Sequence, residues 1–353
     1  MTWETIESWN LALDWAAFNN RLQGSFDWFT RYTYDMVGPA PTLPAALGAA
    51  VPRVNNADMR SRGWELEVSW RDHIKDFYYG VRLVLSDAVQ KVLRYPNETM
   101  TLTDYYKGMT LGEIWGYETE GIAQSDQEIQ DWFDAGNKPD WGSYWGAGDI
   151  MYRSIDGVDG VNDGANTLDN HGDKRIIGNR TPRYNFGITL DFAWKGLDAK
   201  IFFQGVGKRD AWLPSAWFFG AYGSLWNSVV YKEHLDYWRP EDTTDRLGPN
   251  TDAYFARPQF SLYDNYQCQT RYIQNAAYIR LKNVQLGYTL PRKWTRKVGI
   301  DALRLYVTGD NLWTCTKLFS TFDPETIAST HFGAYGTMYP IMKNYAFGVN
   351  INF

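Results

Sequence analysis

The sequence predicts an all-β fold, in which about nine antiparallel strands form a segment of a transmembrane β-barrel. The first observation is the alternation of apolar with small or polar residues, which is typical of a strand with one apolar face. The second is that short turns alternate with long loops, so one end of the sheet is simple and the other elaborate. The third is a set of aromatic residues near the simple end that resembles an interfacial girdle. These residues are Trp15, Trp70, Trp194 and Phe353.

The composition agrees with a membrane β-barrel, and it argues against a helical membrane protein and against a nucleic-acid-binding protein. Aromatic residues make up 17% of the chain, with 17 Trp and 24 Tyr, and such rings collect at membrane interfaces and sugar-binding surfaces. The mean hydropathy of −0.46 is compatible with a barrel, because lumen residues and loops are polar. There is no run of about 18 apolar residues, so we expect no transmembrane helix. The net charge of −6 has no basic cluster, which excludes a nucleic-acid partner.

Two hairpins are expected at the start of the chain. Their strands cover residues 9–17, 22–36, 64–71 and 79–85. Asn19 and Asn20 form the first turn, because Asn tolerates positive φ. A short polar turn at about 72–76 closes the second hairpin. Between the hairpins, residues 37–59 are rich in Pro, Ala and Gly and are expected to form a loop.

Five further strands follow, separated by long loops. The strands cover residues 184–194, 197–203, 278–290, 303–310 and 343–353. Lys195-Gly196 is the expected turn of the third hairpin, and residues 291–299 connect the fourth pair. The long loops cover residues 92–181, 210–270 and 314–342. In the strand 278–290 the apolar parity switches between Leu281 and Val284, which indicates a β-bulge near Asn283.

The last strand has the clearest pattern. Tyr345, Phe347, Val349 and Ile351 alternate with small or polar residues, over about the length that a tilted strand needs to cross a bilayer core. The chain ends on Phe353, as the last strand of bacterial outer-membrane barrels does, so we expect this residue to act as a membrane-assembly signal. The last strand of a soluble β-sandwich is the alternative.

Several stretches carry a family resemblance. They are RSRGWELEVSWRD (60–72), GEIWGYETEGI (112–122), GDIMYRSIDGVDG (148–160), GDKRIIGNRTPRYNFGITLDFAWKGLDAKIFFQGVGKRD (172–210), YIRLKNVQLGYTLP (278–291), LRLYVTGDNLWT (303–314), DPE (323–325) and the terminal YAFGVNINF. In order and spacing they resemble the C-terminal part of SusC-like (RagA-like) TonB-dependent outer-membrane transporters of Bacteroidota. The resemblance covers nearly the whole chain.

The resemblance implies a location in the bacterial outer membrane and a role in transport. The family barrel has about 22 strands, with short periplasmic turns and long extracellular loops. It implies uptake of oligosaccharides, or of peptides in some members, with a SusD-like lipoprotein partner. In the family, TonB drives uptake through a region N-terminal to the part matched here, and the plug domain and signal peptide also lie N-terminal to it. The resemblance therefore implies that none of the three is represented in the matched region. Residues 1–353 are therefore expected to be a C-terminal barrel portion, whose open sheet edges cannot span lipid alone.

One loop is the expected place for contact with the substrate or the lipoprotein lid. The aromatic residues of the 210–270 loop that we single out are Trp212, Trp217, Phe218, Tyr222 and Trp226. Aromatic rings stack on sugar rings, which favours binding here. The loop could equally pack on itself or on a neighbouring loop, and the sequence does not separate the two interpretations.

A Gly-rich acidic loop at 149–173 suggests a calcium site. Its candidate ligands are Asp156, Asp159 and Asp163. The matching family segment reads like DxDGDG, but Ser154 and Val158 stand here where acids would be. The EF-hand spacing and its terminal Glu are also missing. An Asx-rich turn without metal is the alternative interpretation, and no other cofactor is expected.

The sequence gives no sign of an enzyme. Glu65 and Glu67 lie at i, i+2 on a polar strand face, which is the ordinary lumen-facing pattern, so no catalytic residue is expected. The four His residues are scattered, and no GxSxG or P-loop motif is present. Cys268 and Cys315 could pair or stay free. A soluble glycan-binding β-protein or hydrolase, and a non-functional transporter remnant, remain as alternatives.

Overall fold

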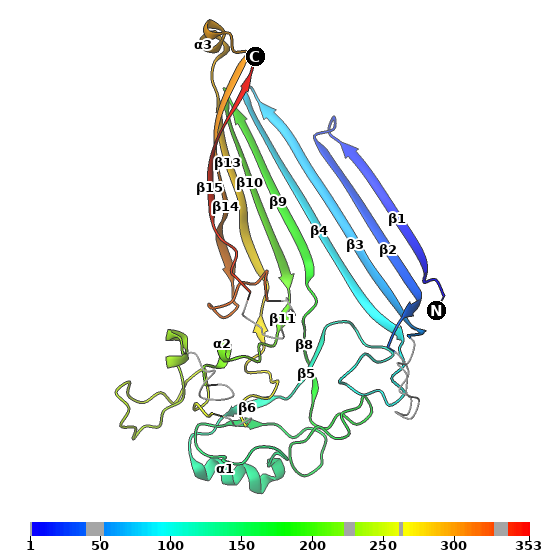
Figure 1. Ribbon diagram of the computed structural model, residues 1–353, viewed down its shortest axis with the longest axis vertical. Coiled ribbons are helices and arrows are strands. Elements are labelled where there is room, and N and C mark those ends of the chain that lie inside the picture. The colour runs from blue at the N-terminus through cyan, green and yellow to red at the C-terminus, as the bar shows by residue number, and fades with distance from the viewer. Residues whose placement is uncertain (1, 40–52, 222–229, 261–263, 328–337) are drawn as a thin grey trace.

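The computed structural model describes residues 2–39, 53–221, 230–260, 264–327 and 338–353. Its main body is an antiparallel sheet with the strand order β1-β2-β3-β4-β9-β10-β13-β14-β15. Figure 1 shows this sheet as a tall curved wall, with tight turns and the C-terminus at one end. Long loops and most of the helices gather at the other end (Figure 1). We call these the simple end and the loop end.

The strands of the wall are β1 (Thr5–Ala17), β2 (Leu22–Val37), β3 (Asn55–Ile74), β4 (Phe77–Arg94), β9 (Arg183–Trp194), β10 (Leu197–Lys208), β13 (Tyr278–Thr289), β14 (Ala302–Thr316) and β15 (Asn344–Asn352). All nine expected strands are therefore confirmed. The strand β3 is 20 residues long and extends well beyond the expected 64–71 toward the loop end. The extension was missed because polar residues interrupt the apolar parity there.

The other elements are shorter. They are β5 (Glu113–Gly116), β6 (Thr119–Ile122), α1 (Asp126–Trp132), η2 (Phe133–Asn137), β7 (Ile150–Tyr152), β8 (Arg175–Asn179), β11 (Asp210–Ala211), α2 (Ala216–Phe219), η4 (Lys232–Leu235), β12 (Gln274–Asn275), α3 (Arg292–Thr295) and η5 (Arg296–Val298). None of the helices in the described ranges is both long and apolar enough to cross a membrane.

The pairing register gives the wall one apolar and one polar face. Residues directly opposite each other in an antiparallel pair point to the same face. Ile188 of β9 lies opposite Leu83 of β4 and Phe203 of β10, so three strands add to one apolar face. The polar face carries ion pairs between neighbouring strands, such as that of Arg82 with Glu67 at 2.6 Å. The predicted alternation is therefore continuous across strands.

The bulge and the turns form where the sequence predicts them. In β13 the residue Lys282 is extra, because Phe202 and Phe203 of β10 pair with Asn283 and Leu281. The backbone of Asn19 and Asn20 has φ values of 56° and 63° in the first turn. The third hairpin turns at Lys195-Gly196, where φ is 46° and 90°. Positive φ matches the right-handed twist of the paired strands.

Aromatic residues border the apolar face at both ends. Trp15, Trp70 and Trp194 lie near the simple end, and Phe353 follows β15 with 89% of its surface exposed. A second belt, near the loop end, was not predicted. It consists of Trp9, Trp28, Trp64 and Trp313, whose partners in the register belong to the apolar face. Two aromatic belts around an apolar band are typical of a sheet that crosses a bilayer.

The long loops fold into a body of their own at the loop end. We call the described residues of 95–182, 209–277 and 317–327 the loop body. Its small sheets pair β5 with β8, β6 with β7 and β11 with β12. Its core has fully buried side chains from all of its large segments, including Ile150, Tyr152, Leu213, Phe218 and Tyr272. The loop predicted at 92–181 is thus a packed structure.

Candidate binding site in the loop body

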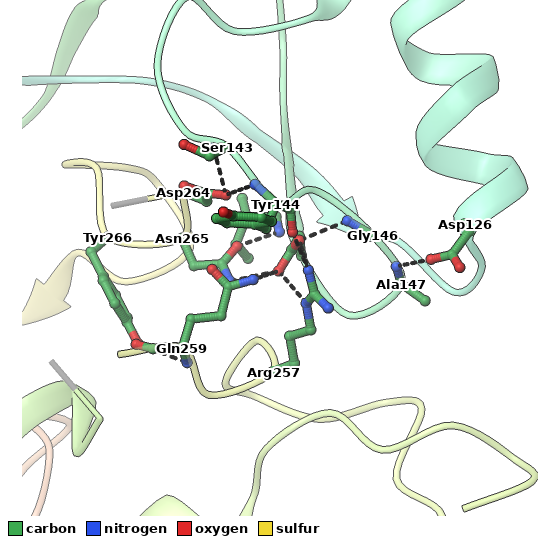
Figure 2. A network of polar contacts seen from close by, with 12 residues as sticks. Asp126, Ser143, Tyr144, Gly146, Ala147, Arg257, Gln259, Asp264, Asn265 and Tyr266 are labelled. Atoms are coloured by element: carbon green, nitrogen blue, oxygen red, sulfur yellow. Dashed lines mark hydrogen bonds and ion pairs between the residues drawn. The ribbon is translucent and has the colours of Figure 1, made fainter. Parts of the chain in front are cut away.

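A buried carboxylate, that of Asp149, ties two distant segments of the loop body together. Figure 2 labels the residues that donate to it, which are Gly146, Arg257, Gln259 and Asn265. Asp149 is fully buried and accepts hydrogen bonds from Arg257 Nε at 2.7 Å and Nη2 at 2.6 Å. Its other donors are the amides of Gln259 and Asn265 and the Gly146 N–H. A buried charge is tolerated only when it is paired and fully hydrogen-bonded. Asp149 therefore fixes the segment after α1 against the segment 257–265.

Asp264, a second fully buried carboxylate, feels the charge of Asp149 and is shown in Figure 2 with Ser143 and Tyr144. Asp264 accepts long hydrogen bonds of 3.4 Å from the backbone N–H groups of Ser143 and Tyr144. Burial raises the pKa of Asp264, and the nearby charge of Asp149 raises it further. The two carboxylates thus have different roles, because only Asp149 has an arginine partner.

His234 of η4 is held in one tautomer by its neighbours. Its Nδ1 accepts a hydrogen bond from the Tyr231 N–H at 2.9 Å. Its Nε2 lies 3.0 Å from the carbonyl oxygen of Phe218, and a carbonyl oxygen can only accept, so Nε2 carries the proton. Burial lowers the pKa of His234. The neutral ring therefore holds η4 against the core.

A hollow of about 850 Å³ opens where β5, β8 and β11 meet. Figure 1 shows these strands between the wall and the rest of the loop body. The lining combines aromatic rings with charges of both signs. The aromatic residues include Tyr105, Trp115, Tyr117 and Trp212, the cations are Lys174, Arg180 and Arg209, and the acids are Asp104, Glu113 and Asp210. Such a lining suits a polar ligand with flat or ring-shaped parts.

The three cations of the hollow differ in how far they are already engaged. Arg209 is buried and donates to the carbonyl oxygens of Arg180 and Pro324, and burial lowers its pKa. Lys174 Nζ lies 3.0 Å from Asp163 Oδ2. The side chain of Arg180 is exposed at the rim. Arg180 is therefore the cation best placed to meet an incoming ligand.

The structure separates the aromatic residues predicted in the 210–270 loop. Trp212 is half-buried and lines the hollow. Trp217 is half-buried and stacks on Tyr231, with the ring centroids 5.9 Å apart. Phe218 is fully buried among the aromatic rings of the core, so it offers no surface to a ligand in this conformation. Tyr222 and Trp226 lie outside the described residues.

The acidic loop at 149–173 is organised by hydrogen bonds. Asp173 is fully buried and accepts from the backbone N–H groups of Ile155 and Asn162. Asp156 accepts from the N–H two residues ahead, which is an Asx turn, and Asp163 pairs with Lys174. Asp159, the third predicted ligand, is exposed. Among the described residues, no group of three or more His, Cys, Asp or Glu is placed to hold a metal ion.

The sequence did not decide whether Cys268 and Cys315 form a disulfide. In the structure both are free thiols. Burial raises the pKa of the Cys268 thiol to about 12, so this cysteine is unreactive at neutral pH. Its carbonyl oxygen accepts a hydrogen bond from the Tyr117 N–H at 2.8 Å, which joins two segments that line the hollow.

The sequence analysis missed Asp149, Asp173 and Arg257. Asp149 and Arg257 are 108 positions apart, and nothing in the local pattern of either segment indicates the contact. The only indication in the sequence was the high content of Asp, Asn and Gly in the loop at 149–173, and this composition predicted a turn or a metal site instead of a buried ion pair.

Comparison with known proteins supports the fold. No family model matches the chain. TonB-dependent receptor P3 of Formosa agariphila is 27% identical over 380 residues, covering 100% of this chain and 34% of the receptor. TonB-dependent receptor SusC of Bacteroides thetaiotaomicron is 22% identical over 373 residues, covering 100% of the chain and 32% of SusC. The chain thus spans about a third of the length of these relatives.

A solved structure described as the RagAB peptide transporter shares the fold. The TM-score is 0.69 with 23% identity, and the match covers 100% of this chain and 36% of that one. The two-faced sheet, the two aromatic belts and the long loops at one end agree with this match. In sequence the chain is therefore similar to about a third of SusC-like TonB-dependent receptors, which are bacterial outer-membrane proteins, and in fold it is similar to the barrel of the RagAB structure.

Proposed function

We propose that the chain contributes the C-terminal part of the wall, and much of the extracellular loop body, to a TonB-dependent nutrient importer. The observation that carries this proposal is the continuous two-faced sheet, with an apolar face toward lipid and a charged face toward the lumen. The loop body supports it, because its folded core holds the hollow at the outer mouth of the wall. The chain is a transport component and not an enzyme.

We propose an oligosaccharide as the first candidate cargo. Trp212 and Trp115 line the hollow, and flat aromatic side chains stack on the apolar faces of sugar rings. Arg180 and Asp210 in the same lining supply donors and acceptors for hydroxyl groups. A ligand of several sugar rings would fill a hollow of about 850 Å³.

A peptide is the second candidate cargo. The hollow carries cations and carboxylates together, such as Arg180 and Glu113, and these would bind the two charged ends of a peptide. The structure described as a peptide transporter has the same fold. The cargo experiment below therefore includes both classes.

We propose two protein partners. A SusD-like lipoprotein would bind at the loop end, and TonB would act through the N-terminal region of the full-length receptor. The loop body exposes large apolar side chains, as a surface for a protein partner does. They include Tyr144, Val230, Leu235 and Leu247. Calcium is not part of the proposal, because each candidate carboxylate of the acidic loop serves the loop itself or faces solvent.

Uptake of labelled cargo by cells that carry the full-length protein tests the function. Fluorescent oligosaccharides and oligopeptides are supplied to cells with and without TonB. We expect TonB-dependent accumulation of one class, with a loss of up to about tenfold in the Trp212→Ala variant, because a stacked ring contributes about 0.5–1.5 kcal/mol. The Trp212→Phe variant keeps a ring and should retain most uptake. Accumulation that is equal without TonB would disprove the importer.

A further inference from the structure

Two cations face each other across neighbouring strands near the loop end of the wall. Arg60 of β3 lies directly opposite Lys91 of β4 in the register. Like charges in directly opposed positions destabilise an antiparallel pair. Arg62, two residues further along β3, adds a third cation on the same face. Its guanidinium lies over the Trp28 ring, 5.8 Å from the centroid, and its Nε lies 3.4 Å from Thr30 Oγ1.

The nearest acids in the described residues make their contacts with groups other than Arg60 and Lys91. Neither Arg60 nor Lys91 forms an ion pair within the described part of the chain. Asp58, two residues before Arg60, pairs with Arg94 at 2.7 Å, and Asp35 of β2 pairs with the same Arg94 at 2.7 Å. On the same face, Asp87 of β4 pairs with Arg183. Glu7 of β1 accepts a hydrogen bond from Trp9 Nε1 and is separated from Arg60 by Tyr32 of β2 in the register.

In the described residues, the segment beside Lys91 brings one carboxylate, Glu113, which accepts from the Thr110 N–H and the Tyr106 hydroxyl and forms no ion pair with Lys91. On its free side, Lys91 pairs through the backbone with Thr110, which is uncharged. Residues 40–52, between β2 and β3, contain no Asp or Glu in their sequence. In the described part of the chain, no ion pair with Arg60 or Lys91 offsets the repulsion between these two cations, and an external anion would offset it.

The position of the cluster relative to the membrane indicates which anion. Arg60 and Arg62 share the parity of Trp64, so they point to the lipid side of the wall. Arg60 lies four residues beyond Trp64, or about 13 Å along the strand. Lipid headgroups occupy the layer just outside an aromatic belt. Because the long loops are extracellular, this layer belongs to the outer leaflet.

We propose that Arg60, Arg62 and Lys91 bind a phosphate group of an anionic lipid in the outer leaflet. The guanidinium group of Arg forms bidentate hydrogen bonds with phosphate oxygens, and the ammonium group of Lys adds a compact positive charge. The long side chains can bend toward the headgroup layer while their stems cover the strand. The headgroup site goes beyond cargo uptake and does not depend on which cargo the protein carries.

Lipid binding to the full-length protein in neutral detergent tests the headgroup site. Native mass spectrometry follows the titration with lipid A, dephosphorylated lipid A and inorganic phosphate as probes. We expect lipid A to bind, and the Arg60→Gln/Lys91→Gln double variant to bind it about thirtyfold more weakly, about fivefold for each cation removed. The control is Lys195→Gln, which removes an exposed cation at the simple end. It should bind as the native protein does.

Three results would overturn the proposal. They are unchanged lipid A binding in the double variant, equal binding of dephosphorylated lipid A, and inorganic phosphate binding as tightly as lipid A. The last result would make this a site for free phosphate and not for a lipid. Folding of each variant is checked by heat-modifiable migration in electrophoresis. If the double variant fails to assemble, the single variant Lys91→Gln is used, with the expected fivefold effect.

The unfolding temperature gives an independent test, because Lys91→Gln should raise it without lipid and should reduce the further increase that lipid A causes. In phosphate-free detergent, Lys91→Gln should raise the unfolding temperature, because it removes a like-charge pair. Added lipid A should raise the unfolding temperature of the native protein more than that of the variant. A merely structural role for Lys91 would predict a lower unfolding temperature in both conditions, and this outcome would contradict the proposal.

Discussion

Asp149 is the side chain on which the loop body depends most. It is fully buried, and five hydrogen bonds from four residues converge on its two oxygens. All five hydrogen bonds come from N–H groups, so only an acceptor that carries a negative charge satisfies the site. Replacement by Asn would place an NH₂ group against donors and leave Arg257 without its counter-ion.

We expect Asp149→Asn to weaken the loop body by about 3 kcal/mol, because one partner of a buried ion pair is lost. Hydrogen exchange of the amides in 143–150 and 257–265 measures the effect. Asp156→Asn is the control, since that carboxylate is exposed and its one hydrogen bond holds only an Asx turn. Equal exchange in the two variants would show that Asp149 does not tie the segments together.

His234 predicts a dependence on pH. The pKa of His234 is lowered in the folded protein, chiefly by burial, so the unfolded state takes up a proton first as the pH falls. The contribution of His234 to stability is complete above its ordinary pKa of about 6.5 and is lost as the pH falls from there toward the folded pKa. Protonation of Nδ1 would also break the hydrogen bond from Tyr231.

We therefore expect η4 and the residues around it to be cleaved faster by protease at pH 5 than at pH 7.5, after correction for protease activity. The His234→Gln variant is the control, because Gln can accept from Tyr231 and donate to Phe218 without titrating. Its cleavage should change less with pH. An equal pH effect in the variant would assign the sensitivity to another group.

At the scale of the element, each wall strand is defined by its two faces. On β9 the neighbours Ile188 and Thr189 point to opposite sides of the wall, as the register requires. Ile188 lies in the apolar band between the two aromatic belts, with Leu83 and Phe203 beside it. Thr189 lies opposite Arg82 and Phe202 on the lumen side. One strand thus offers a matched pair of sites at the same depth.

We expect Ile188→Arg to destabilise the folded barrel by about 2–4 kcal/mol, because it places a charge in the lipid core. Thr189→Arg should cost much less, since the lumen is polar. Urea-induced unfolding of the full-length protein in lipid vesicles measures both. Similar losses in the two variants would mean that the faces of the wall are assigned wrongly.

At the scale of the whole molecule, the sheet ends in two edges. The outer strands of the described sheet are β1 and β15, and neither pairs with the other. An unpaired backbone N–H or C=O costs several kcal/mol in lipid, so a sheet with open edges does not span a bilayer. The remaining strands of a closed barrel have to pair with β1 and β15.

Residues 1–353 expressed alone, behind an outer-membrane signal sequence, are therefore expected to aggregate or be degraded. Co-expression with the N-terminal two-thirds of a related receptor should restore heat-modifiable migration in the outer-membrane fraction. The complete related receptor serves as the positive control for that migration. A heat-modifiable species from residues 1–353 alone would mean that these strands close a barrel, singly or as an oligomer, and would refute the expectation.

The amino-acid sequence by itself determined the wall. Its strands, two faces, tight turns and the bulge at Lys282 were predictable because each follows from a pattern within a short stretch. Alternation fixes which side chains share a face, and Asn or Gly marks a turn that needs positive φ. The aromatic belt at the simple end was predictable for the same reason, whereas the polar ends of β3 and β4 broke the alternation and hid the second belt.

Only the tertiary structure decided the loop body and the candidate site. It placed Trp212 at the hollow and Phe218 in the core, although the two lie six positions apart in one aromatic stretch. It also joined Asp149 to Arg257 and set Arg60 opposite Lys91. These arrangements depend on contacts between segments far apart in the chain, and such contacts leave no periodic signal in either segment. The backbone of the wall is specified locally, whereas the surfaces that bind ligands are specified by packing.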